Sequence, residues 1–266
     1  SNLQDNDIAY NIPTAFYIKG ELDRTRFNIA IQKLIERYES LRTSFELKNG
    51  QAVQVIHDQV DFAIEEFVAD EAEIDQVIDS FIRPFDLDQA PLFRVGLVKL
   101  ENKHLLIFDI HHIVSDGRSM EIIINDFIKV YQGQQLEELD IQYKEYAAWQ
   151  NQFFASDKIN SQEEFWLDTF DQIPILDLPL DYNRPAKLNY SGGRVQLEID
   201  ELITDKLIKL ANEKKSTLFN LLLAAYNILL AKYSGQDDLV VGTPIEGRTR
   251  PEFRNIVGMF VNTLAM

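Results

Sequence analysis

Residues 104–131 read HLLIFDIHHIVSDGRSMEIIINDFIKVY, and this stretch decides the fold. Its first part, His104–Val114, is an apolar run typical of a buried strand. After the pair Asp116-Gly117, apolar residues recur at helical spacing from a start near Ser119. These positions are Met120, Ile123, Ile124, Phe127, Ile128 and Tyr131. The stretch therefore predicts a strand, a tight turn and an amphipathic helix that closes near Gly133.

Further strands and helices are predicted on both sides of this stretch. The expected strands are Ala15–Ile18, Ala52–Ile56, Leu92–Leu100 (a hairpin with His104–Val114), Arg194–Ile199 and Leu239–Thr243. The expected helices are one capped by Asp23 with Phe27, Ala30, Ile31, Leu34, Ile35 and Tyr38 on its apolar face, then Ile74–Ile82, Gln142–Phe154, Gln162–Phe170, Glu201–Glu213 and a buried helix Thr217–Tyr233. This interleaving favours an α/β fold with two lobes.

The lobe boundary is expected at residues 171–193, which hold three of the eight prolines and a Gly-Gly pair. Residues 1–170 then form the first lobe and residues 194–266 belong to the second.

Composition excludes several classes of function. The 266 residues carry a formal net charge of −17, which argues against a nucleic-acid module. The absence of cysteine excludes disulfides, thiolate metal sites and a cysteine nucleophile. No secretory signal precedes Asn11, and the most apolar stretch, Leu218–Tyr233, is shorter than the roughly 20 residues of a membrane span. We therefore expect a cytoplasmic protein without a membrane partner.

Two of the four histidines, His111 and His112, end the predicted strand. Adjacent side chains on a strand point to opposite faces, so the two imidazoles diverge. His111 shares a face with Asp109, which we expect to satisfy it. His112 shares the other face with Phe108 and Ile110, and we expect it to face a cavity.

The residues alone leave three interpretations of His112 open. It is a satisfied core histidine, a metal ligand, or a general base at a strand end. No further histidine lies at ligand spacing, so no metal site is expected. Ser115 lies three residues after His112, yet the chain has no Gly-x-Ser-x-Gly nucleophile elbow.

Five stretches then match a known family in order. They are RYESLRTSF (37–45), RPFDL with PL (83–87 and 91–92), HHIVSDG (111–117), YKEYAAW (143–149) and VGMFVNT (257–263). They resemble the motifs of condensation domains of nonribosomal peptide synthetases, the third being the HHxxxDG motif. Tyr38 stands where the family usually has histidine, and Arg118 where tryptophan is common, from which we expect only altered packing at the helix start.

The resemblance implies the two-lobed fold of chloramphenicol acetyltransferase, an α+β sandwich of mixed sheets covered by helices. The chain resembles the N-terminal lobe and the first part of the C-terminal lobe. The second lobe is then incomplete, and the chain alone is expected to be inactive. The activity implied is amide formation, in which a carrier-bound amine attacks a carrier-bound acyl or peptidyl thioester. The sequence of the chain is most similar to those of domains that join an L-configured donor residue to an L-configured acceptor residue.

The resemblance also implies roles for the site residues. His112, beside His111, acts as a base or positions the amine. Asp116 is structural and pairs with Arg42, or alternatively with Arg37.

Three further residues complete the expected site. Gly117 suits a tight turn and lets substrate approach. Asn262 and Ser115 are expected beside the acceptor tunnel.

The expected partners are upstream and downstream peptidyl carrier domains and an adjacent adenylation domain. No cofactor binds directly, because the carriers deliver phosphopantetheine. Two alternatives share the motif: a coenzyme-A-dependent acyltransferase and a non-catalytic carrier-docking fragment.

Overall fold

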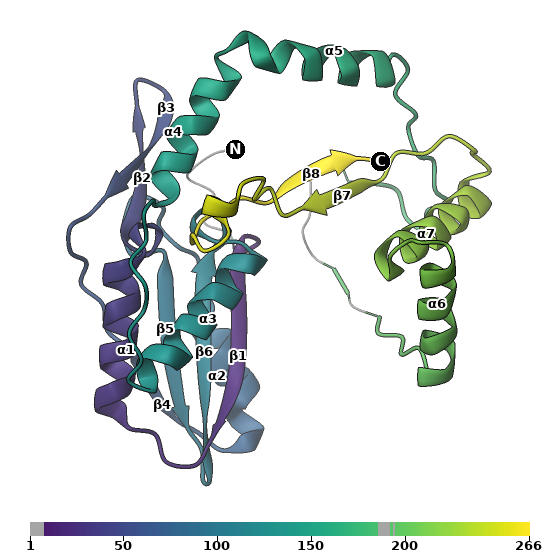
Figure 1. Ribbon diagram of the computed structural model, residues 1–266. Helices are drawn as coiled ribbons and strands as arrows, with labels where there is room; N and C mark the ends of the chain where they lie inside the picture. Colours follow the sequence, from purple (N-terminus) through teal and green to yellow (C-terminus); the bar gives the residue numbers. More distant parts are fainter. Residues whose placement is uncertain (1–7, 186–191, 194) are drawn as a thin grey trace. The chain divides into compact units, whose positions relative to one another are not determined.

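The computed structural model describes residues 8–185, 192–193 and 195–266 (Figure 1). Its contacts divide the chain into two compact units. The first runs to Ile159 and also contains Glu246–Asn262, and the second consists of Asn160–Ile245 with Thr263–Met266. Residues 246–262 thus pack with the first unit although the sequence boundary assigns them to the second lobe. The lobe boundaries themselves stay a prediction.

The first unit is built around a four-stranded sheet. Its strands are β1 (Asn11–Lys19), β4 (Glu65–Val68), β5 (Phe93–Lys99) and β6 (Lys103–His111), and a separate hairpin consists of β2 (Thr43–Lys48) and β3 (Gln51–Ile56). Its helices are α1 (Arg24–Arg37), α2 (Ile74–Phe81), α3 (Gly117–Tyr131) and α4 (Tyr143–Phe154). The sheet order is β1-β6-β5-β4, with β6 antiparallel to both neighbours and β4 parallel to β5. The mixed α/β class expected from the sequence is confirmed.

Helices cover both faces of this sheet (Figure 1). On one face of β6, Leu106, Phe108 and Ile110 pack in the core cluster that α1 and α3 complete. On the other, Leu105 and Ile107 pack in the cluster that contains α2 residues. Because β6 is buried on both sides, its sequence is a continuous apolar run rather than an alternating one. Asp109 and His111 continue the face that α2 covers.

The prediction that a strand extends through Val114 is wrong. Strand β6 ends at His111, and His112–Val114 form a 3₁₀ turn. The Nδ1 atom of His111 accepts a hydrogen bond from the N–H of Ile113 at 3.1 Å, and the N–H of Ser115 donates to the carbonyl of His112 at 3.3 Å. These two bonds replace strand pairing, so His112 does not obey the strand alternation assumed for it.

Helix α1 begins as predicted, and α3 begins at Gly117, two residues before the start expected near Ser119. The carboxylate of Asp23 caps α1 by accepting from the N–H of Arg26, and Asp116 caps α3 by accepting from the N–H of Ser119. The hydroxyl of Tyr38 joins the two helices by donating to Asp126 on α3 at 2.6 Å. Burial and this bond raise the pKa of Tyr38 far above its ordinary value.

Among its described residues, the second unit contains three helices and most of a two-stranded sheet. They are α5 (Asn160–Thr169), α6 (Glu201–Glu213), α7 (Leu218–Ser234), and the paired strands β7 (Gly242–Ile245) and β8 (Asn262–Ala265). Residues 171–185 form neither helix nor strand, in keeping with a linker, whereas 186–191 and 194 lie outside the described residues. Within the part of the chain that the structure describes, no helix is long and apolar enough to cross a bilayer.

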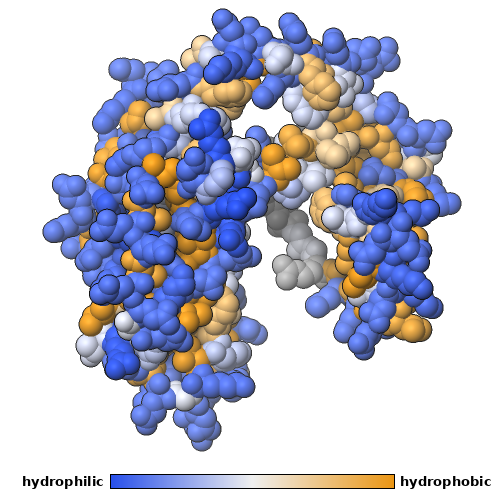
Figure 2. Space-filling model, viewed as in Figure 1, coloured by the Kyte–Doolittle hydropathy of each residue, from blue (hydrophilic) through white to orange (hydrophobic). Residues whose placement is uncertain are grey.

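Three expectations for the second unit differ from the structure. Residues 195–199 form no strand: they pair with neither β7 nor β8, and Val195 is 98% exposed. The strand expected at Leu239–Thr243 is displaced to β7. Helix α7 lies within one residue of the expected bounds at each end but buries only Leu230 among its described residues, so it is not a buried helix. Figure 2 shows apolar side chains at the surface of this unit, and those of α7 are Phe219, Leu222, Tyr226, Ile228, Leu229 and Tyr233.

Candidate active site

Asp116 is the centre of a buried hydrogen-bond network at the start of α3. Its carboxylate accepts hydrogen bonds from four groups. Two are local, the N–H and the hydroxyl of Ser119 at 2.7 Å, and two come from the distant segment 246–262, the guanidinium of Arg248 at 3.0 Å and the N–H of Phe260 at 3.0 Å. The side chain of Asp116 is 4% exposed and that of Arg248 is 1% exposed. A buried carboxylate needs such partners, since burial of an unpaired charge is costly.

The ion pair expected between Asp116 and Arg42 or Arg37 is therefore wrong. Arg42 instead donates to the carbonyl of His57 and lies 3.8 Å from Glu39. Arg37 lies at the end of α1, where it faces Asp126 of α3 at 3.4 Å. Each of these arginines faces a different carboxylate, and Asp116 pairs instead with a cation 132 residues further along the chain.

Arg248 ties the segment 246–262 to the start of α3. Besides Asp116, its guanidinium donates to the carbonyls of Phe253 and Ile256 at 2.7 Å each. It also lies over the ring of Phe260, 4.0 Å from the ring centroid. No sequence pattern marks Arg248 as a site residue, because only the fold brings its side chain close to Asp116.

Ser119 is a second residue that the sequence analysis did not assign to the site. Its hydroxyl oxygen accepts from the N–H of Gly258 at 3.0 Å and from Arg248 at 2.9 Å. The single hydroxyl proton is shared between Asp116 at 2.7 Å and the Gly258 carbonyl at 2.8 Å. The sequence offered one signal for a contact between Ser119 and Asp116, namely their separation of three residues at the start of the predicted helix.

His111 is held by its surroundings rather than by Asp109. Its imidazole packs edge-on against Phe85, with ring centroids 6.2 Å apart, and near Tyr10 at 6.1 Å. Burial, with the neighbouring His112, lowers the pKa of His111 to about 4. The expected pairing with Asp109 is not formed. Arg94 at 2.9 Å and the amide of Asn11 at 2.8 Å both bind Oδ2 of that carboxylate, and its Oδ1 has no hydrogen-bond partner among the described residues.

His112 occupies a different environment from its neighbour. It is half-buried at the start of the 3₁₀ turn, and its N–H donates to the carbonyl of Tyr10 at 2.8 Å. Its imidazole makes no hydrogen bond to any other described residue. The backbone N–H of His112 is thus held by Tyr10, while its imidazole remains available to a ligand.

The remaining expected site residues differ in exposure. Ser115 is fully buried, and its hydroxyl lies 3.4 Å from the carbonyl of Asp116, which argues against a tunnel-lining position. Gly117 is exposed, its φ lies outside the left-handed region, and an added Cβ would meet nothing within 4 Å. The chain itself therefore does not require glycine there, contrary to the tight turn expected. Asn262 is exposed, two residues after Phe260.

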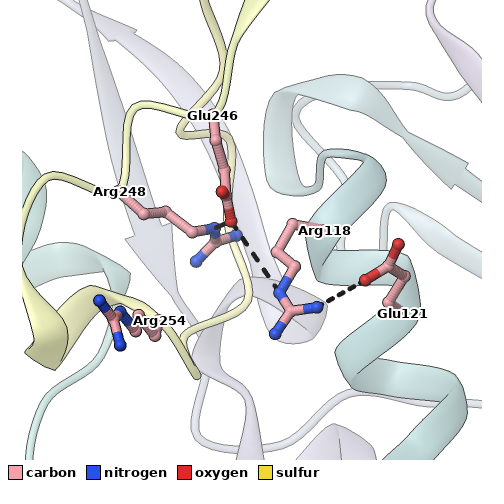
Figure 3. Close-up of a pocket in the computed structure, with 5 residues that line it drawn as sticks. All are labelled: Arg118, Glu121, Glu246, Arg248 and Arg254. Carbon is pink, nitrogen blue, oxygen red and sulfur yellow. Dashed lines mark hydrogen bonds and ion pairs between the residues drawn. The ribbon is translucent and has the colours of Figure 1, made fainter. Parts of the chain in front are cut away.

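A charged cavity of about 570 Å³ adjoins Arg248 (Figure 3). Arg118 pairs with Glu121 at 2.6 Å and lies 3.9 Å from Glu246, which is 3.8 Å from Arg248. Arg254 completes the lining. Arg118 thus pairs with Glu121 along α3 and with Glu246 across this cavity, beyond the altered packing expected of it. Within the described residues, no cluster of three or more His, Cys, Asp or Glu side chains is suited to a metal ion.

Comparisons with known proteins agree on one family. The sequence model of the family described as "Condensation domain" matches residues 1–266. Gramicidin S synthase 2 of Aneurinibacillus migulanus is 52% identical over 261 residues, which are 97% of this chain and 6% of that protein. The chain thus spans only a small part of the length of the curated relatives that it matches.

Two solved structures show the same fold. One is a four-domain nonribosomal peptide synthetase bound to AMP and glycine, with a TM-score of 0.83 and 27% identity over 97% of this chain and 20% of that one. The other is the X-domain in its complex with OxyB from teicoplanin biosynthesis, with a TM-score of 0.86 and 25% identity over 98% of this chain and 61% of that one.

Proposed function

The chain belongs to the condensation-domain family, and on that premise we propose that it contributes the HHxxxDG half of a site that forms amide bonds between carrier-bound substrates. The donor is an acyl or peptidyl thioester and the acceptor is an aminoacyl group, each on the phosphopantetheine arm of a carrier domain. The proposal includes L-configured donor and acceptor residues. Its partners are the two carriers and an adenylation domain.

One observation carries this proposal. The imidazole of His112 is half-buried and unpartnered among the described residues, while the backbone around it is fixed by Tyr10 and the 3₁₀ turn. Such an arrangement presents a hydrogen-bond acceptor at a fixed position, as a general base or a positioning group requires. Neither Asp116 nor His111 is comparably available, because both are engaged within the chain.

The reaction is an aminolysis in which His112 accepts a hydrogen bond from the attacking amine. The nitrogen forms a bond to the thioester carbonyl carbon, the carbon–sulfur bond breaks, and the thiol of the donor carrier leaves. The proton that the amine loses passes by way of the imidazole to the departing sulfur. Holding the two arms in line supplies much of the rate, because it makes the encounter effectively unimolecular. Asp116 and Arg248 take no part in the bond changes and hold the start of α3.

The substrate class is tested by reconstitution with the complete protein that carries this chain. A donor aminoacyl carrier and an acceptor aminoacyl carrier are mixed with it, and the acceptor carrier is examined for dipeptidyl thioester by intact mass spectrometry. We expect dipeptide on the acceptor carrier. The parallel reaction supplies the donor as its coenzyme A thioester and the acceptor as the free amino acid. Product in that reaction alone would assign a coenzyme-A-dependent acyltransferase, and carrier binding without product would assign a docking role.

A further inference from the structure

Asp109 is a buried charge on a strand face that is otherwise apolar. It is fully buried and lies two residues before His111, on the face that Leu105 and Ile107 present to α2. Its side chain pairs with Arg94 at 2.9 Å, directly opposite in the register of β5 and β6. A buried ion pair is weak evidence for stability, since apolar residues of similar volume often serve as well. Its presence here points to a requirement for fixed geometry.

Arg94 connects this carboxylate to the chain segment after α2. Its guanidinium donates to the carbonyl of Arg83 at 2.6 Å and to that of Pro84 at 2.7 Å. The amide of Asn11, opposite His111 in the register of β1 and β6, also donates to the Arg83 carbonyl at 3.0 Å. Three strands and the segment after α2 are thus joined at the end of β6.

The ring of Phe85 connects the Arg94–Asp109 pair to His111 of the HHxxxDG motif. The guanidinium of Arg94 lies 3.6 Å from the centroid of the Phe85 ring, and that ring packs edge-on against the imidazole of His111. His111 in turn accepts the N–H of Ile113, which sets the 3₁₀ turn that begins with His112. A continuous series of contacts therefore runs from the Arg94–Asp109 pair to the backbone of His112.

We propose that the Arg94–Asp109 pair is a positioning pair for His112, acting through Phe85 and His111. The inference rests on the proposed function, because it concerns the same imidazole. Neither member of the pair contacts His112. Their role is to hold the turn in the geometry at which the imidazole meets the attacking amine.

The test uses Asp109→Asn in the complete protein, with Asp126→Asn as the matched control. Asp126 is also a buried carboxylate of the first unit, 7% exposed, and it pairs with Tyr38 and Lys129 away from the motif. We expect Asp109→Asn to lower kcat for amide formation by about 10- to 100-fold, the order expected for a misplaced reacting group, with unchanged KM for both carriers. Asp126→Asn is expected to lower the melting temperature and to retain kcat. Equal kcat values for the two variants would overturn the proposal.

A second readout does not depend on turnover. Backbone hydrogen exchange, followed by mass spectrometry on the peptide that covers residues 110–115, reports whether the turn is held. We expect faster exchange of this peptide in Asp109→Asn and an unchanged rate in Asp126→Asn. Unchanged exchange in Asp109→Asn would refute the positioning pair whether or not the protein forms amide bonds. An inactive wild-type protein would instead count against the proposed function.

Arg94→Lys is the milder companion if Asp109→Asn fails to fold. It keeps a cation beside Asp109 but removes the fork that reaches two carbonyls. We expect the same loss of kcat and the same faster exchange of residues 110–115. Wild-type values of both quantities would contradict the inference.

Discussion

Replacement of Asp116 by alanine tests how the start of α3 is held. The variant leaves the guanidinium of Arg248, 1% exposed, without its carboxylate. Removal of one partner from a buried ion pair typically costs about 3–5 kcal/mol. The remaining hydrogen-bond acceptors of Arg248 are two carbonyls and the Ser119 hydroxyl, which carry no charge. The carboxylate of Glu246 lies 3.8 Å away and is 61% exposed, so it offsets the charge only weakly. The variant also leaves the N–H of Phe260 without the acceptor that it now has. We therefore expect the loss to lie toward the upper end of that range.

The assay is urea unfolding of the complete protein, with the free energy of unfolding taken from the linear dependence on denaturant. Arg248→Met removes the other partner, and the double variant closes a thermodynamic cycle. We expect the double variant to lose less stability than the sum of the two single variants, because neither charge is left buried alone. Glu71→Gln, which breaks the exposed pair with Lys103, is the control and should cost at most about 1 kcal/mol.

Two results would refute this reasoning. One is a cost for Asp116→Ala no larger than that for Glu71→Gln. The other is coupling of Asp116 to Arg42 rather than to Arg248 in the corresponding cycle, which would restore the pairing expected from the motif.

Three further predictions concern the same region. Burial raises the pKa of Asp109 to about 6 and lowers that of His111 to about 4, so between pH 4 and 6 a rise in pH destabilises the fold through Asp109 and stabilises it through His111. Relative to wild type, the free energy of unfolding of Asp109→Asn should rise by up to about 3 kcal/mol as the pH increases across this window, and that of His111→Gln should fall by about as much. Both are measured by urea unfolding at each pH, and pH profiles parallel to that of wild type would contradict both shifts. Ser119→Ala should cost about 1–3 kcal/mol, because the N–H of Gly258 loses its buried acceptor, and an unchanged melting temperature would argue against that bond. Gly258→Ala should unfold more readily still, since its Cβ would overlap the ring of Tyr143, and a fully stable variant would exclude that close approach.

Local patterns in the sequence predicted the elements that flank the motif. The cap at Asp23 and the helical spacing of the residues after Ser119 depend on neighbours within one turn and are confirmed. The same holds for the bounds of α6, Glu201–Glu213. Such features can be read from a single chain because the interactions that form them are short in sequence.

Features that depend on distant residues could not be predicted in this way. The partner of Asp116 is an arginine 132 residues away, and no spacing rule distinguishes it from Arg42 or Arg37. The end of β6 depends on whether the imidazole of His111 accepts from Ile113, which periodicity does not report. The apolar face of α7 predicts burial, but burial also requires a covering element, and the described residues supply one only at Leu230.

The most direct test of the central claim is the single-turnover rate of dipeptide formation by His112→Ala in the complete protein. His104→Ala is the matched control, because it removes an imidazole from the other end of β6. We expect His112→Ala to retain the wild-type melting temperature and to lose about 100-fold or more in rate, the order supplied by a positioned acid–base group, with His104→Ala near wild type. A folded His112→Ala protein that forms dipeptide at the wild-type rate would contradict the account.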